Sequence, residues 1–220
     1  MKMFEQPDFD IYAFLTHDII TTSTEPTTED CEDDWWGDCW EKPVIYLYPE
    51  QEMAVSVELE FAGQLSCTYP AYNDGWSVTA KPDGTLTDEK GRKYYCLFWE
   101  GSGEQKYDMS KGFVIKGAET AAFLEKTLGY LGLNEKEANE FIIYWLPRME
   151  QNPYNLITFQ TTDYEKNAKL IVEPKPDSVL RVFMTYKPLK ESICVEPQQL
   201  DAFERKGFTV IEWGGTEVHY

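Results

Sequence analysis

Apolar and polar residues alternate in the first half of the chain, which predicts strands with one buried face. The clearest case is MAVSVELEF, residues 53–61, whose inward positions are Val55, Val57, Leu59 and Phe61. VIYLYP (44–49) and QLSCTYP (64–70) are further strand candidates. YNDGW (72–76) and KPDGTLTDEKGRKYY (81–95) carry the Asp-Gly signals of hairpin turns. We therefore expect this half to be a sandwich-like antiparallel sheet of five or six strands.

The spacing becomes helical in the middle of the chain. Residues 118–131 place one apolar stripe before Gly132, a favourable helix stop, and the stripe comprises Ala121, Leu124, Leu128 and Leu131. Asn134 and Glu137 have the spacing of a capping box for a second helix, with a buried side formed by Ala138, Phe141, Ile142 and Trp145. Pro147 is expected to end or kink that helix near Leu146. The sequence thus predicts a helical hairpin packed on the sheet.

Strand patterns return after the hairpin, in residues 155–160, 168–174 and 178–188. A short helix is expected at 197–207 and a last strand at 208–213. Strands, then helices, then strands again predict an α+β fold with an antiparallel sheet core, because the regular alternation of βαβ units is missing.

The charge of the chain is concentrated at its start. The 220 residues carry a formal net charge of −19, and residues 1–41 hold twelve acids against Lys2 alone. We expect 1–41 to be an acidic, partly disordered leader and 42–220 to be a single domain. A nucleic-acid partner is disfavoured, because such binding needs clustered cations. Membrane insertion is not expected either, because no apolar run is long enough to cross a bilayer.

Localisation is left between two compartments. The first twenty residues lack an uninterrupted apolar stretch, because Glu5, Asp8 and Asp10 fall within it, so they do not resemble a signal peptide. A soluble cytoplasmic protein is the direct interpretation. A truncated N-terminus would instead allow an extracytoplasmic one.

The chain contains five cysteines, so at least one is unpaired if all bonds are intramolecular. Cys31 and Cys39 are candidates for a local disulfide, and Cys67 and Cys96 for one between two strands; free thiols are the alternative for both pairs. The spacing of Cys31 and Cys39 is unusual for zinc. Three nearby acids, Asp33, Asp34 and Asp38, lack the spacing of a calcium loop. We expect no metal site.

Catalytic groups are scarce. No GxSxG elbow, phosphate-binding loop or dinucleotide fingerprint occurs, so no cofactor is expected. Asp74, Glu100 and Glu140 each lie beside a tryptophan, and paired acids with aromatic walls suit a sugar-cleaving cleft. The same acids also suit turns and solvated surfaces. They are the only weak candidates for catalysis, and we lean towards a protein that is not an enzyme.

Binding candidates come from the aromatic residues and from the segment YWLPRMEQNPYN (144–155). A concave pocket lined by Trp76, Trp99 and Trp145 would be a ligand site. Arg148, Asn152 and Tyr154 could form a polar patch for an anionic or sugar ligand. The favoured alternative is that they clamp the second helix to the sheet, with Arg148 pairing Glu140 or Glu150.

Six long runs resemble a bacterial family of uncharacterised proteins over residues 42–217. They are KPVIYLYPE, LSCTYPAYNDGWSVTAKPDGTLTD, LFWEG, ANEFIIYWLPRMEQNPYNLITFQ, PDSVLRVFMTYKP and ERKGFTVIEWGG. The resemblance implies one domain of common ancestry and assigns no activity. We therefore predict a domain of unknown function that binds an unknown protein or glycan, with a carbohydrate or peptide hydrolase using paired carboxylates as the alternative.

Overall fold

The computed structural model describes residues 39–160 and 162–219, and these residues build two sheets and a small number of helices. Across the larger sheet the strands are β3 (Gln64–Tyr69), β7 (Leu97–Ser102), β1 (Cys39–Tyr48), β12 (Thr209–Glu217), β11 (Ser178–Leu189), β9 (Tyr154–Gln160) and β8 (Phe113–Lys116). Across the smaller sheet they are β10 (Ala168–Glu173), β2 (Met53–Phe61), β4 (Trp76–Ala80), β5 (Leu86–Thr87) and β6 (Lys93–Tyr94). The predicted sheet-rich, mainly antiparallel architecture is confirmed.

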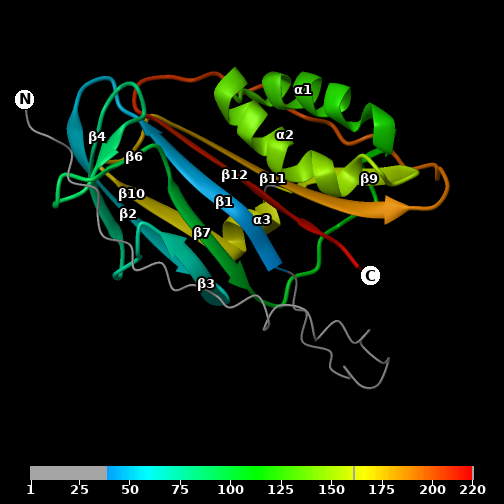
Figure 1. Cartoon of the computed structure of the whole chain (residues 1–220), viewed down its shortest axis with the longest axis horizontal. Coiled ribbons are helices and arrows are strands. Elements are labelled where there is room, and N and C mark those ends of the chain that lie inside the picture. The colour runs from blue at the N-terminus through cyan, green and yellow to red at the C-terminus, as the bar shows by residue number, and fades with distance from the viewer. Residues whose placement is uncertain (1–38, 161, 220) are drawn as a thin grey trace, which may run out of the picture. The chain divides into compact units, whose positions relative to one another are not determined.

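Helices α1 (Thr120–Leu131) and α2 (Glu135–Met149) lie on one face of the larger sheet (Figure 1). A 3-10 turn (Gly117–Glu119) precedes α1, and the short α3 (Thr162–Asn167) precedes β10. The capping box is present: the Asn134 side chain accepts from the Glu137 N–H at 2.9 Å, and the Glu137 carboxylate accepts from the Asn134 N–H at 2.9 Å. Gly132 ends α1 at φ 106°, as its position predicts.

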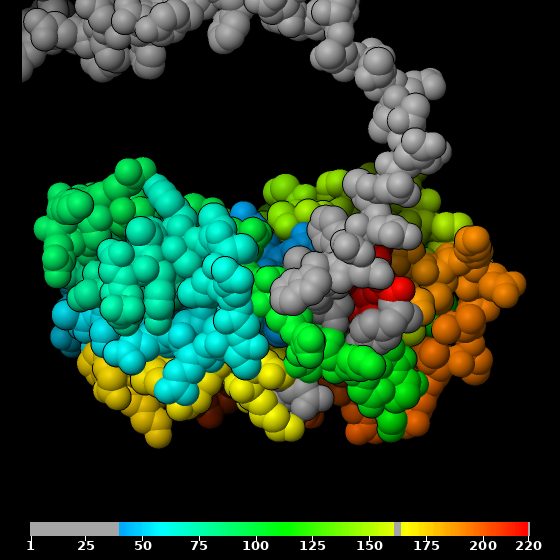
Figure 2. Space-filling view, turned by 90° about the horizontal axis from the view of Figure 1, so that it is seen from below, coloured from blue at the N-terminus to red at the C-terminus, as the bar shows by residue number. Residues whose placement is uncertain are grey.

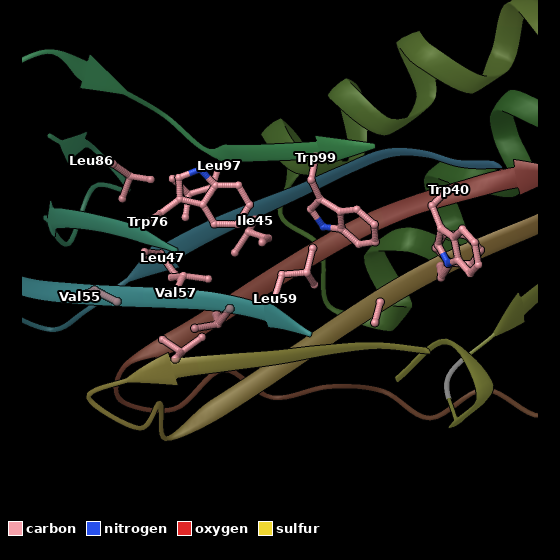
Figure 3. Close-up of a cluster of buried hydrophobic side chains, with 14 of the residues drawn as sticks. Trp40, Ile45, Leu47, Val55, Val57, Leu59, Trp76, Leu86, Leu97 and Trp99 are labelled. Carbon is pink, nitrogen blue, oxygen red and sulfur yellow. The ribbon is translucent and has the colours of Figure 1, made fainter. Parts of the chain in front are cut away.

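Two apolar cores lie on opposite faces of the larger sheet. The inter-sheet core fills the space between the two sheets and includes Ile45 and Leu47 of β1 (Figure 3). The helix-side core lies under α1 and α2 and includes Val44 and Tyr46 of the same strand. The run VIYLYP is apolar at successive positions because β1 is central and both of its faces are covered.

Strand β2 shows the predicted alternation. Val55, Val57 and Leu59 are buried in the inter-sheet core, and the residues between them are exposed. Its neighbours in the sheet are β4 and β10, both antiparallel to it. Figure 2 shows β2 and β10, in cyan and yellow, lying side by side on one face.

Two predicted helix features differ from the structure. The helix expected at 197–207 is absent, because the Gln198 side chain and Arg205 hold this segment against β9 and Gly132 instead. Pro147 does not end α2, which continues to Met149; the proline lies in the last turn, beside the exposed Ile143. The pairing of β11 with β12 is parallel, within a sheet whose other strand pairs are antiparallel.

Candidate functional site

The three candidate tryptophans pack in the cores and do not share a pocket. Trp76 and Trp99 lie in the inter-sheet core and Trp145 in the helix-side core, with exposed fractions of 3%, 0% and 0%. The Trp99 indole donates to Glu212 at 3.0 Å, and the Trp76 indole donates to the Pro70 carbonyl at 2.8 Å. These rings therefore serve first as packing groups, and among the three only Trp76 also borders a described hollow.

The three candidate acids come from three different elements, which are the turn before β4, strand β7 and helix α2. Asp74 is in the turn before β4, with φ 57°. Glu100 accepts from the Lys42 N–H at 3.3 Å, and Glu140 accepts from the Tyr46 hydroxyl at 2.5 Å. Lys42 and Tyr46 are four residues apart on β1, with a bulge between Glu41 and Val44, so the two acids contact different positions of this strand. Each of these two acids is thus engaged with a different part of β1.

Arg148 holds the end of α2 to β1. Its guanidinium forms an ion pair with Glu41, which also accepts from the Tyr144 hydroxyl at 2.9 Å. The guanidinium carbon lies 4.4 Å from the centre of the Tyr144 ring. The carboxylate that pairs with Arg148 therefore belongs to Glu41, whereas the sequence suggested Glu140 or Glu150.

Asn152 and Tyr154 fill the connection from α2 to β9. The Asn152 amide donates to the Arg148 carbonyl at 3.2 Å and to the Asn155 side chain at 2.7 Å. Tyr154 is the first residue of β9 and pairs with Lys116 and Leu189 on either side. This arrangement is the one expected of a clamp between helix and sheet, and it supports that alternative.

A buried ion pair was missed by the sequence analysis. The Arg181 Nε lies 2.5 Å from a Glu212 carboxylate oxygen, and the two side chains are 5% and 0% exposed. Arg181 also donates to the Ala168 carbonyl at 2.5 Å and stacks 4.5 Å from the Tyr164 ring. The available signal was one lone charge within each of two apolar runs, SVLRVF and TVIEW.

The candidate disulfide between Cys67 and Cys96 is not formed, and both thiols are free, as is that of Cys194. The ladder of β3 and β7 pairs Cys67 with Glu100, four positions from Cys96, so the two sulfurs cannot meet. Cys96 is buried, and burial raises its pKa to about 12. The other expected disulfide involves Cys31, which lies outside the described residues.

One hollow of about 420 Å³ lies beside Trp76, between the turn before β4 and the turn from β5 to β6. We call it the Trp76 hollow; its lining includes Asn73, Trp76, Ser77, Asp88, Glu89, Lys90 and Tyr94. Asp88 shapes its wall, because its carboxylate accepts from the N–H groups of Lys90 and Arg92 and from the Tyr94 hydroxyl, at 2.8–3.0 Å. The pKa of the Asp88 carboxyl is lowered, chiefly by the hydrogen bond from the Arg92 N–H.

Two further kinds of feature, a metal site and a membrane-spanning helix, are absent from the described residues. Within 39–160 and 162–219, no group of three or more His, Cys, Asp and Glu side chains is placed to hold a metal ion. In the same residues, no helix is long and apolar enough to cross a bilayer.

Comparison with known proteins identifies one similar bacterial protein. No protein-family profile and no solved structure matches the chain. An uncharacterised protein from the region 3′ of bglA in Butyrivibrio fibrisolvens is 48% identical over 63 residues, which are 27% of this chain. The match spans 65% of that protein, slightly less than two thirds of its length. The chain is therefore similar to an uncharacterised bacterial protein, which agrees with the resemblance of its sequence runs.

Proposed function

We propose that residues 42–220 form a single α+β domain that acts as a binding module, with a glycan held in the Trp76 hollow. The observation that carries this proposal is the lining of the hollow, in which two aromatic side chains lie among amide, hydroxyl, carboxylate and ammonium groups. Its volume of about 420 Å³ is within the range of small-molecule sites.

The chemistry of the lining fits a polyhydroxylated ligand. Asn73 offers an amide that both donates and accepts, Glu89 offers acceptors and Lys90 offers donors, and all three side chains are exposed. Tyr94 adds apolar surface, and Trp76, which is 3% exposed, adds a little more. A sugar ring needs both kinds of contact, because it presents hydroxyl groups at its rim and C–H groups on its faces.

The alternative function is a hydrolase that uses Glu100 and Glu140. In glycosidases the two working carboxyl groups lie about 5–10 Å apart across the scissile bond. Here each acid contacts a different residue of β1, and Glu140 is held by the Tyr46 hydroxyl. This arrangement gives less support to catalysis than the lined hollow gives to binding.

A glycan array probed with the full chain tests the proposal. We expect a small set of related glycans to bind, and Asn73→Ala and Glu89→Gln to weaken that binding at least tenfold. Glu191→Gln, an exposed change outside the hollow, is the matched control and should bind as the unmodified chain does.

Two results would contradict the binding module. The first is the absence of any bound glycan on the array. The second is equal binding by the Asn73 and Glu89 variants and the control. Cleavage of a bound glycan that is lost in both Glu100→Gln and Glu140→Gln would instead support the hydrolase.

A further inference from the structure

Strand β10 and the first part of β11 each have an open side. β10 is the outermost strand of the smaller sheet, with β2 as its neighbour. β11 pairs with β12 over residues 178–186, but with β9 only over residues 183–189. Residues 178–182 therefore have no strand on the β9 side within the described part of the chain.

The direction of the backbone groups in β11 follows from two hydrogen bonds. The Ser178 N–H donates to the Phe208 carbonyl at 3.2 Å, and the Tyr186 carbonyl accepts from the Val218 N–H at 2.8 Å. Both bonds are on the β12 side of the strand. Because successive residues of a strand turn their N–H and C=O groups to opposite sides, those of Val179 and Arg181 face the open side.

The same reasoning applies to β10. The Asn167 carbonyl accepts from the Ala62 N–H at 2.7 Å, towards β2. The next carbonyl, that of Ala168, faces away from β2 and accepts from the Arg181 guanidinium at 2.5 Å. By alternation the backbone groups of Leu170 and Val172 face the same open side.

The two open sides border one groove of about 530 Å³, which we call the edge groove. Its apolar lining comes from Leu170, Ile171, Val172, Pro176 and Val179. Val179 is 44% exposed, which is high for a valine in a strand. The contact from Arg181 to Ala168 links the two strands beside the groove. The groove therefore combines apolar side chains with backbone groups that no strand of the described residues pairs, and an extended peptide satisfies both.

The charges around the edge groove balance. Glu165 and Glu173 face Lys175, whereas the charges of Lys169 and Arg181 are neutralised by Glu60 and Glu212, so little net charge remains. A strongly charged ligand gains little attraction at such a rim, although the whole chain carries a net charge of −19. The groove suits an uncharged extended segment.

We propose that the edge groove binds an extended, uncharged peptide segment of a partner protein by strand addition to β10 or β11. The open backbone groups of Leu170 and Val172, or of Val179 and Arg181, hydrogen-bond the segment. Three residues of strand span about 10 Å, so three or four residues of the partner are engaged. Alternate side chains of the segment contact the apolar lining. The site is separate from the Trp76 hollow and does not depend on it.

A display library of random seven-residue linear peptides, selected on the full chain, tests this inference. We expect enrichment of peptides with apolar residues at alternate positions. An enriched peptide is then resynthesised with N-methyl groups on alternate amides, which remove its donors on one side. Its affinity should fall at least tenfold, because the strand pairing is lost.

Variants of the chain test whether the peptide binds in the edge groove. Val179→Lys puts a charged chain over the apolar lining and should weaken binding at least tenfold. Ile193→Lys is the matched control, because Ile193 is 42% exposed and does not line the groove, and it should leave the affinity unchanged. If Val179→Lys lowers the melting temperature, the N-methylated peptide on the unmodified chain decides the question.

Three results would overturn the inference. One is the absence of enrichment above the library background. Another is equal affinity of an enriched peptide for the unmodified chain and for a folded Val179→Lys variant. The third is a concentration-dependent dimer that Val179→Lys abolishes, since a second copy of the chain would then occupy the groove.

Discussion

Arg181 and Glu212 bring two opposite charges into the inter-sheet core. Moving each charge out of water costs several kcal/mol, and this cost is offset only when the partners satisfy each other's hydrogen-bonding groups. Here the Glu212 carboxylate receives both the Arg181 guanidinium and the Trp99 indole, and Arg181 also binds the Ala168 carbonyl. The pair therefore joins β11 and β12 to the start of β10 and fixes how the two sheets meet.

Removing one member of this pair should lower the free energy of unfolding much more than removing both. Arg181→Met leaves the Glu212 carboxylate buried without its cation, and we expect it to lower the free energy of unfolding by about 3–5 kcal/mol. The double variant Arg181→Met, Glu212→Leu should lose less than Arg181→Met alone. Urea unfolding of both variants measures the difference.

An exposed ion pair provides the control. Lys169 and Glu60 lie 2.9 Å apart with both side chains about 60% exposed, so Lys169→Met should change the free energy of unfolding by less than about 1 kcal/mol. The coupling of Arg181 and Glu212 would be contradicted if the double variant Arg181→Met, Glu212→Leu lost as much free energy of unfolding as the two single variants lose together.

Single residues also show where sequence reasoning about the site stops. The positions of Trp76, Trp99 and Trp145 beside acids suggested exposed aromatic walls, but an indole looks the same in a sequence whether it binds a ligand or fills a core. The packing of the layers decides, because Trp99 lies in the core between the two sheets and is fully buried there. The groove-lining Val179 gave no signal at all, since an exposed valine looks the same in a sequence as a buried one.

At the scale of elements, local chemistry predicted the caps of the two long helices better than it predicted whether a segment forms a helix at all. The capping box at Asn134 and the stop at Gly132 depend on residues within one turn, and both are present. The segment 197–207 also has helical composition, yet it forms no helix. Its side chains contact distant residues instead: Gln198 bonds the backbone of Phe159, and Arg205 bonds Glu137 and the Gly132 carbonyl.

The Asn134 cap should make a measurable contribution to stability. Asn134→Ala removes the acceptor for the Glu137 N–H, and we expect a loss of about 1 kcal/mol in the free energy of unfolding, within a range of about 0.5–2. Chemical denaturation followed by far-UV circular dichroism gives the value.

Asn139→Ala is the matched control for this change. Asn139 is exposed within α2, where alanine is the better helix former, so stability should stay the same or rise slightly. A loss at position 139 as large as that at position 134 would show that the cap is not responsible.

At the scale of the whole molecule, the sequence predicted the strands but not their order. Alternation of buried and exposed residues within β2 is a local property, and the sequence predicted it correctly. The pairing of β1 with β12 joins residues about 170 positions apart, and the parallel pairing of β11 with β12 places two neighbouring strands of the chain in the same direction. Such contacts depend on the two cores that the strands share, which no window of sequence contains. The Trp76 hollow and the edge groove follow from that order, so neither could be predicted completely.

On the helix side of the larger sheet, three tyrosine hydroxyls donate hydrogen bonds to carboxylates. Tyr46 donates to Glu140 and Tyr186 to Glu217, each at 2.5 Å, and Tyr144 donates to Glu41 at 2.9 Å. Burial first, and then the neighbouring carboxylates, raise the pKa of all three phenols well above the ordinary value of 10.0. The folded form therefore keeps these protons at a pH where the unfolded chain loses them.

The sign of the resulting pH dependence follows from the proton counts. Below pH 10 these phenols are protonated in both states, so their contribution to stability is fully present. Above pH 10 the unfolded state binds fewer protons, so the free energy of unfolding falls by up to about 1.4 kcal/mol per pH unit for each of them. We expect the urea midpoint to fall steeply between pH 10 and pH 11.5, with tyrosinate absorbance rising as the chain unfolds. Tyr186→Phe should reduce that slope by about one proton, whereas Tyr130→Phe, at a residue that is 55% exposed, should not. A midpoint that is flat to pH 11.5, or equal slopes in the two variants, would contradict the idea that these buried hydroxyls limit the alkaline stability of the fold.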